Sequence, residues 1–257
     1  MDYGDIAQTF AAFVILAVVA LGVMTLNGVQ VRRDYLGAAV RSVVQLTLVA
    51  LIVAWVFVHP AGVGGYLLVM LVAAALTSAR RVHLSWREAW LCALPIAVGA
   101  ALAVGPVLIT GALPVEARTV LPFTAQIIGG SMTAVSLAGG RFRDDVLTEW
   151  EVVEGYLALG ATARQAVSAV GRRAVERSLI PSLDQMRSAG LVVLPGAFVG
   201  MLLGGATPAE AAQVQLLVLF ALMAAATTAA TTVVWLLAPR YGSRRPGSPV
   251  VGSAQSG

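Results

Sequence analysis

Polar side chains interrupt an apolar stretch at residues 119–138, and their types suit the lining of a path through a membrane. Gln126, Gly130 and Thr133 fall on one helical face because they are four and three residues apart. Polar groups that face lipid are costly, so this face meets either protein or a water-filled path. Close helix packing through small residues is the alternative interpretation. The candidate path residues of this stretch are Gln126, Gly130, Ser131, Met132, Thr133 and Ser136.

Two further stretches place ionisable or polar side chains at the edge of apolar sequence. Asp184 and Arg187 are three residues apart, so on a helix they can pair and offset part of the cost of charge near lipid. Arg41 and Gln45 share one face of another stretch, where Arg41 either extends to the lipid headgroups or takes part in the path. Met186 offers a soft thioether ligand or simply fills space. Asp184, Met186, Arg41 and Gln45 complete the set of candidate path residues.

Small residues recur at four-residue intervals in the stretch from 179 to 203. Gly196, Gly200 and Gly204 line one helical face, which allows another backbone to approach closely. Pro195 lacks a backbone donor and therefore predicts a kink in the middle of this stretch. The kinked helix acts either as a moving element or as static packing.

Catalytic residue sets are missing from the sequence. It contains no Lys, hence no phosphate-binding loop of the Gly-x-x-x-x-Gly-Lys-Ser/Thr type, and no His-Glu-x-x-His motif. Ser131 has no histidine at membrane depth to serve as its base, which argues against an intramembrane hydrolase. His59 and His83 are expected on opposite sides of the membrane and Cys92 is alone, so metal ligands stay unknown. We predict that the chain is not an enzyme and holds no cofactor of its own.

Composition indicates which elements must position these residues. Of 257 residues, 58% are apolar and 12% are charged, whereas roughly 25% are charged in soluble domains. A soluble core cannot absorb so much apolar surface, so we predict an all-α polytopic membrane protein with one transmembrane domain over residues 1–240. About seven stretches are long enough to cross a bilayer as helices. They are residues 6–26, 38–58, 64–79, 89–109, 119–138, 179–203 and 211–237.

The arginines indicate how the chain is oriented. All 17 basic residues are Arg, and all but Arg118 follow the first, third, fifth and seventh stretches or lie near the same face. The positive-inside rule makes that face cytoplasmic, so we expect the N-terminus outside and the C-terminus inside. This placement explains the net charge of +4 better than nucleic-acid binding does. The Gly/Ser/Pro-rich residues 241–257 are predicted to form a disordered tail.

The cytoplasmic segment at residues 140–178 is longer than a connection needs. Apolar residues at helical spacing from Val146 to Leu157 predict one helix that Gly160 ends. Thr162 and Gln165 form a capping box that starts a second helix. This second helix is expected to bury Val167, Val170 and Ala174 and to expose Arg164, Arg172, Arg173 and Arg177. The pair either docks a cytoplasmic partner or lies as an amphipathic hairpin at the membrane surface.

Residues 154–161, Glu-Gly-Tyr-Leu-Ala-Leu-Gly-Ala, followed by Ile180-Pro181, resemble the EAA-type loop of ABC transporter permeases. Flanking motifs narrow the resemblance to the FetB-type (YbbM-like) permease family, over most of residues 35–240 and best over 120–205. These motifs are Ser131-Met132, Ala134-Val135-Ser136-Leu137, Leu179-Ile180-Pro181-Ser182-Leu183, Met186 and the run Gly-Leu-Val-Val-Leu-Pro-Gly at 190–196, together with Arg41 and Gln45-Leu46.

The resemblance implies the membrane-spanning permease subunit of an ABC transporter in the bacterial plasma (inner) membrane. It implies a homodimer, a separate P-loop ATPase subunit that binds ATP and Mg, and a metal ion such as iron as the exported substrate. The loop would be a coupling helix, with Glu154, Leu157, Leu159, Gly160 and Ala161 as its ATPase-coupling residues. A stand-alone carrier driven by an ion gradient is the alternative, and it would need titratable groups at mid-membrane.

Overall fold

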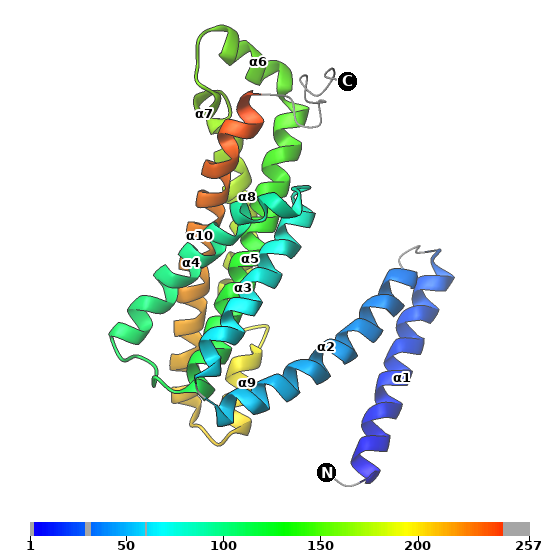
Figure 1. The fold of residues 1–257 in the computed structure, drawn as a ribbon. Helices are drawn as coiled ribbons and strands as arrows, with labels where there is room; N and C mark the ends of the chain where they lie inside the picture. The colour runs from blue at the N-terminus through cyan, green and yellow to red at the C-terminus, as the bar shows by residue number, and fades with distance from the viewer. Residues whose placement is uncertain (1–2, 29–31, 60, 244–257) are drawn as a thin grey trace, which may run out of the picture. The chain divides into compact units, whose positions relative to one another are not determined.

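The structure is a computed structural model that describes residues 3–28, 32–59 and 61–243 (Figure 1). Its chain divides into two compact units, residues 1–59 and residues 60–257. The described ranges contain helices and no strand, which confirms the predicted all-α class. The helices are α1 (Tyr3–Leu26), α2 (Arg32–Val58), α3 (Gly62–Arg81), η1 (Trp86–Glu88), α4 (Trp90–Ile109), α5 (Ala117–Thr148), α6 (Trp150–Ala158), α7 (Ala163–Ala166), α8 (Ser168–Ser188), α9 (Gly196–Leu203) and α10 (Pro208–Ser243).

The first unit is a hairpin of α1 and α2. Gly28 follows α1 with a φ of +66°, a backbone conformation that favours glycine. Residues Tyr35–Val58 are long and apolar enough to cross a membrane, and Ala11–Leu26 form a shorter apolar helix. Large apolar side chains such as Leu16 and Leu51 are exposed on both helices, as contact with lipid would require.

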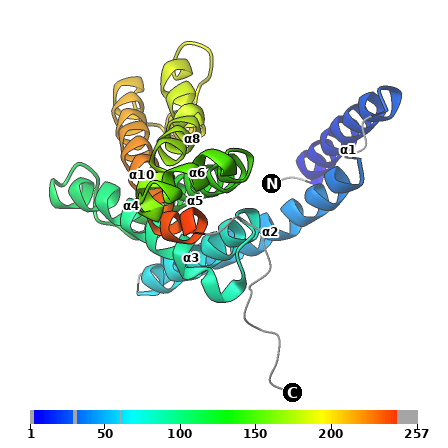
Figure 2. The same cartoon turned by 90° about the horizontal axis from the view of Figure 1, so that it is seen from above.

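Two long helices, α5 and α10, form the centre of the second unit. α10 packs against α4, α5, α7, α8 and α9, and α5 also packs against α3 and α4 (Figures 1 and 2). Gly130 lies against Leu222 and Gly139 lies near Leu237, so the two central helices run in the same direction. Phe142 is fully buried between them and α8. These helices are the frame on which the candidate site residues are held.

Two spans approach each other closely where α4 packs on α10. A Cβ atom at Gly99 would lie 2.7 Å from the carbonyl oxygen of Ala225 and 3.1 Å from the Cβ atom of Ala229. Neighbouring positions on α10 are also alanines, and Ala226 and Ala230 are buried. Small residues let helix backbones approach closely in a membrane, where packing drives association more than the hydrophobic effect does.

Gly99→Ala is therefore expected to lower stability by about 1–3 kcal/mol, because the added methyl group must push backbone away. Thermal unfolding of the protein in detergent would measure the change. Gly140→Ala on α5 is the matched control, since a Cβ atom there meets nothing within 4 Å. An equal loss of stability in both variants would contradict the assigned crossing.

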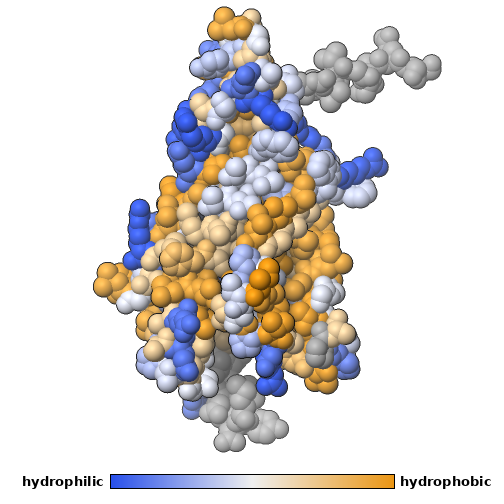
Figure 3. Space-filling view, turned by 90° about the vertical axis from the view of Figure 1, so that its left-hand side faces the viewer, coloured by the Kyte–Doolittle hydropathy of each residue, from blue (hydrophilic) through white to orange (hydrophobic). Residues whose placement is uncertain are grey.

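Five helices of the described ranges are long and apolar enough to span a bilayer. They lie at Tyr35–Val58, Gly62–Arg81, Trp86–Ile109, Ala117–Thr148 and Pro208–Ser243, and they match the predicted stretches two, three, four, five and seven. Apolar side chains cover the middle of the face shown in Figure 3, and hydrophilic ones gather toward the end that carries α6 and α7. Residues 241–243, predicted to begin a disordered tail, instead end α10, and residues 244–257 lie outside the described ranges.

Candidate functional site

The sixth predicted stretch, residues 179–203, is not one kinked helix but two helices separated by residues 189–195, which we call the break. α8 runs from the predicted cytoplasmic segment through Pro181 and ends at Ser188. Gly190 then takes a φ of +77°, and its N–H donates to the carbonyl of Val193 at 2.9 Å. Pro195 is extended and cannot donate, so α9 begins only at Gly196. The glycine and the proline together turn the expected kink into a full interruption.

Ion pairs fix the depth of the break along α5. Arg173 bonds Glu149 at 2.6 Å and Arg177 bonds Asp145 at 3.4 Å, so α8 runs antiparallel to α5. At 1.5 Å per residue, this register carries the end of α8 to the level of about residue 134 of α5. Beyond the break, α9 shares a cavity of about 660 Å³ with the first turns of α5. The break is therefore level with the middle of α5, where the candidate path residues lie.

The predicted polar face of α5 divides between the surface and the interior. Gln126 and Thr133 are exposed, and Gln126 lines the cavity shared with Gly200 of α9. Gly130 is half-buried against Leu222. Thr133 donates its hydroxyl back to the carbonyl of Gly129 at 3.1 Å. Only part of this face is thus available to line a path in the chain itself.

Two inward-facing serines of α5, Ser136 and Ser131, differ in their hydrogen bonding. Ser136 and Ser78 of α3 share a hydroxyl hydrogen bond of 3.0 Å, and Ser78 also reaches the carbonyl of Met132 at 3.2 Å. These bonds hold α3 to α5, as the packing interpretation expects. Ser131 is fully buried, and its hydroxyl has no hydrogen-bond partner among the described residues.

A buried glutamine in α10 was missed by sequence reasoning. Gln215 is 5% exposed, and neither its amide oxygen nor its amide nitrogen has a partner within the described part of the chain. The Thr124 hydroxyl on α5 is likewise unpartnered, at a similar level in these parallel helices. A buried polar group without a partner costs about 1–3 kcal/mol, so such groups call for water or a ligand. The available signal was a glutamine inside the seventh apolar stretch.

Charged side chains of α8 reach the level of the last apolar turn of the predicted span in α5. Asp184 pairs with Arg187 at 3.6 Å, and their side chains are 62% and 75% exposed. The register along α5 places both level with about residues 135–138, at the predicted cytoplasmic edge of that span. Met186, between them, is half-buried. Charge at this depth is costly against lipid, so it marks a surface that meets protein or water.

The remaining sequence candidates lie elsewhere. Arg41 and Gln45 are exposed on α2 and belong to the first unit. Gly196 and Gly200 were expected to admit a neighbouring backbone, but a Cβ atom at either would meet nothing within 4 Å. Gly204 touches only its own helix end. α9 has only eight residues, too few to sustain the close crossing that was expected there. A close approach of this kind occurs instead between α4 and α10, at Gly99. No group of three metal-binding side chains occurs in the described ranges.

The predicted cytoplasmic segment, residues 140–178, folds back on itself at an exposed turn. This turn is formed by residues 159–162, and we call it the α6–α7 turn. Leu159 is 86% exposed, and Val152 and Tyr156 on α6 are exposed beside it. Gly160 has a φ of +86°, which confirms the predicted helix end. Glu154 is exposed, whereas Leu157 packs on the core and Ala161 is half-buried. The turn therefore presents apolar side chains that the chain itself leaves uncovered.

The two helices beside this turn differ in part from the prediction. The capping box is confirmed, because the Thr162 hydroxyl accepts from the Gln165 N–H and the Gln165 side chain accepts from the Thr162 N–H. The first helix is not continuous, since α5 extends to Thr148 and Glu149 separates it from α6. Buried and exposed faces of the second helix follow the prediction, except that Arg173 is half-buried. The buried residues are Val167, Val170 and Ala174, and the exposed ones are Arg164, Arg172 and Arg177.

α10 fixes the α6–α7 turn to the bundle. Gly242 packs directly on the backbone of Ala163, and a Cβ atom there would overlap the carbonyl oxygen. The Arg173–Glu149 pair ties α8 to the residue that joins α5 and α6. Force applied at the turn would therefore reach α5, α8 and α10 together.

Gly242→Ala is expected to displace α7 and loosen the α6–α7 turn, at a cost of about 1–3 kcal/mol. Amide hydrogen exchange should rise in residues 150–167 and stay unchanged in α4. Gly155→Ala in α6, where a Cβ atom meets nothing within 4 Å, is the control. Unchanged exchange in the Gly242 variant would show that this contact does not hold the turn.

Several apolar helices of bilayer length define a multi-pass α-helical membrane protein. The chain belongs to the uncharacterised protein family UPF0014, whose model matches residues 7–241. It is 31% identical over 228 residues to the UPF0014 membrane protein YjkA of Bacillus subtilis, which covers 88% of this chain and 90% of the relative.

Two other relatives carry more specific descriptions. The probable iron export permease protein FetB of Escherichia coli is 25% identical over 240 residues, 93% of each chain. Protein ALUMINUM SENSITIVE 3 of Arabidopsis thaliana is 29% identical over 234 residues, 90% of this chain and 85% of the relative. The resemblance to FetB-type proteins is thereby confirmed. No solved structure matches the chain.

Proposed function

We propose that this chain is the permease subunit of an ABC transporter in the bacterial plasma membrane, with its N-terminus outside. A separate P-loop ATPase would bind ATP and Mg, and two copies of the permease would enclose the path. The observation that carries the proposal is the exposed, apolar α6–α7 turn fixed to the long helices. Leu159 projects from it almost fully exposed, and an uncovered apolar tip of this kind suits a groove on a partner.

The transmission of movement follows from the contacts of the turn. Closure of an ATPase pair would push α6 and α7, and the Arg173–Glu149 and Gly242–Ala163 contacts would pass the push to α8 and α10. α8 leads directly to the break, whose residues lack a helical hydrogen-bond ladder and give way more easily than the flanking helices. The break and the middle of α5 would then alternate between two arrangements around the substrate.

The substrate we propose is a metal ion such as iron, moved outward. This rests on the relative described as a probable iron export permease and on the exposed carboxylate of Asp184 at the edge of the predicted span. A carboxylate and the oxygens freed at the break are hard donors that suit a cation. The unpartnered Gln215 of α10 and Thr124 of α5 add buried oxygen donors.

A pull-down of the tagged protein from its native membrane in mild detergent, read by mass spectrometry, tests the proposal. A stoichiometric P-loop ATPase should be recovered with the wild-type chain. Leu159→Glu should reduce that recovery about tenfold, equal to roughly 1.4 kcal/mol of binding free energy. Trp86→Glu is the control, because Trp86 is 74% exposed in η1, which Glu88 ties to Arg240 at the same end of α10.

Recovery of no ATPase with the wild-type chain would contradict an ABC transporter. It would favour the second candidate, a stand-alone carrier driven by an ion gradient. One observation supports that candidate: the exposed Asp184–Arg187 pair places a titratable carboxylate at the edge of the predicted span. Transport by reconstituted protein under an imposed pH gradient without ATP would then be the result expected.

A further inference from the structure

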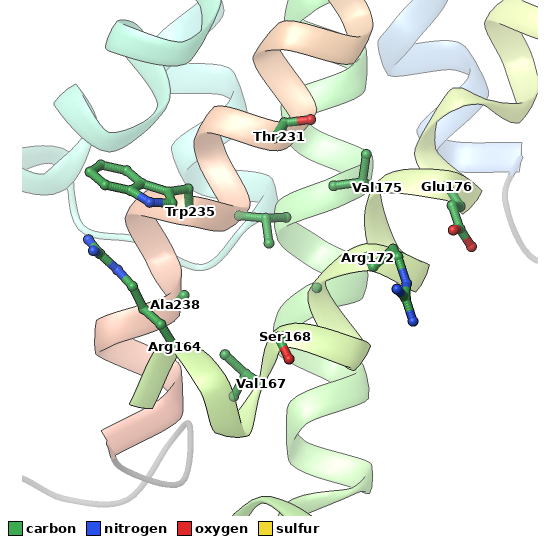
Figure 4. A pocket seen from close by; sticks show the side chains of 11 residues that line it. Arg164, Val167, Ser168, Arg172, Val175, Glu176, Thr231, Trp235 and Ala238 are labelled. Carbon is green, nitrogen blue, oxygen red and sulfur yellow. The ribbon is translucent and has the colours of Figure 1, made fainter. Parts of the chain in front are cut away.

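A second cavity lies far from the break, in a groove between α8 and the last turns of α10. It has a volume of about 360 Å³. Its walls are mainly apolar, with Val167 and Val175 on one side and Val234 and Trp235 on the other (Figure 4). Arg164, Arg172 and Glu176 are its charged residues. The proposed transport function uses none of these side chains.

Two arginines of the groove have no acidic partner among the described residues. The guanidinium of Arg164 lies 4.1 Å from the centre of the Trp235 ring, which holds the charge at one end of the groove (Figure 4). Arg172 lies on the first turns of α8, where it lines the same groove. In contrast, Arg173 and Arg177 of the same helix are engaged by Glu149 and Asp145. With Glu176 counted, the groove keeps one net positive charge.

The depth of the groove matches the boundary between headgroups and acyl chains. Trp235 is 55% exposed and lies five residues before Arg240 on α10, and exposed tryptophans gather at membrane interfaces. Thr231 and Val175 lie about one turn further from that end than Trp235 and Arg172. The Arg164 end of the groove thus faces the headgroup layer, and the end at Thr231 and Val175 faces the acyl chains.

We infer that this groove binds one phospholipid with a net negative headgroup. Arg164, which points toward Trp235, binds the phosphate, since guanidinium groups make the strongest hydrogen bonds to phosphate oxygens, and Arg172 on the opposite side of the groove adds positive charge (Figure 4). One acyl chain lies along Val167, Val175 and Val234. Basic pockets between membrane helices on the cytoplasmic side take anionic lipids in this way. A protein partner fits less well, because a helix about 10 Å across is much wider than the single acyl chain that we place in this cavity of about 360 Å³.

The test is native mass spectrometry of the full-length protein released from nanodiscs. One set of nanodiscs holds phosphatidylcholine alone and the other holds phosphatidylcholine mixed with phosphatidylglycerol. The wild-type chain is expected to retain one phosphatidylglycerol per chain and to discriminate against phosphatidylcholine. The double variant Arg164→Gln/Arg172→Gln should lose this retention by about tenfold or more, equal to roughly 1.4 kcal/mol.

Two further variants separate the groove from general attraction by charge. Arg80→Gln/Arg81→Gln removes the same charge from the end of α3, where both residues are exposed, and should retain the lipid. Thr231→Trp keeps every charge but fills the groove, and should lose the lipid. Equal loss in the α3 variant, retention by Thr231→Trp, or equal retention of phosphatidylcholine would each overturn the inference. Displacement of the lipid by inorganic phosphate at millimolar concentration would also overturn it, since the site would then be one for free phosphate.

Discussion

Gly160→Pro is expected to abolish ATP-driven transport while the protein remains folded in the membrane. Gly160 has a φ of +86°, whereas proline fixes φ near −65°. The N–H of Gly160 also donates to the carbonyl of Leu157 at 3.0 Å, and proline would remove that donor. The α6–α7 turn must therefore take another shape, although the long helices lose no contact.

The measurement is ATP-dependent uptake of Fe²⁺ into inside-out vesicles that contain this chain and the ATPase subunit proposed for it. We expect a loss of at least about tenfold, because a displaced turn no longer transmits closure of the ATPase pair. ATP hydrolysis by the complex should persist, so that hydrolysis and transport become uncoupled. Gly155→Ala is the matched control, since it lies in the adjoining helix and faces open space. Normal transport by the proline variant would rule out a coupling role for this turn.

Asp184→Asn is expected to give the second large effect, again a loss of about tenfold or more in Fe²⁺ transport. Asp184 is exposed, so the substitution removes charge without opening a cavity. The amide offers a cation a weaker ligand and leaves Arg187 without its counter-charge, which repels a cation in the path. Expression and thermal unfolding should match those of the wild type.

A charge swap distinguishes a path residue from a structural pair. The double variant Asp184→Arg/Arg187→Asp keeps an ion pair on α8 but moves the carboxylate by almost one turn. Restored transport in the swap would show that only the pair matters, and would contradict a direct role for Asp184. Asp144→Asn is the control, because that exposed carboxylate pairs with Arg143 at 3.1 Å beyond the apolar part of α5.

The α6–α7 turn shows how far local sequence carries a prediction. A capping box needs only Thr162 and Gln165, and a left-handed turn needs only Gly160, so both features follow from residues within one helical turn. The buried stripe of α8 could also be predicted, because its apolar residues recur with the 3.6-residue period of a helix. The interruption at Glu149 between α5 and α6 could not be predicted, since both sides of it carry the same helical pattern.

The sequence alone did not show whether each polar residue inside the apolar stretches lines a path or packs against another helix. Spacing placed Gln126, Gly130 and Thr133 on one face, but it could not say that Leu222 covers Gly130. Ser136 became a helix contact because Ser78 lies opposite it, 58 residues away in the chain. Gln215 became a candidate site residue because its amide is buried without a hydrogen-bond partner among the described residues. The sequence cannot show this, since burial depends on all the neighbouring helices.

The sequence by itself determined the class of the protein, the ends of several spans and the turn between α6 and α7. These features depend on the transfer of side chains into lipid and on backbone geometry within a few residues. Only the tertiary structure decided that the sixth stretch divides at residues 189–195 and that Asp184 on α8 lies level with the cytoplasmic edge of the predicted span in α5. The level of Asp184 depends on the ion pairs that fix the register of α8 on α5, and these join residues 24 and 32 positions apart in the chain.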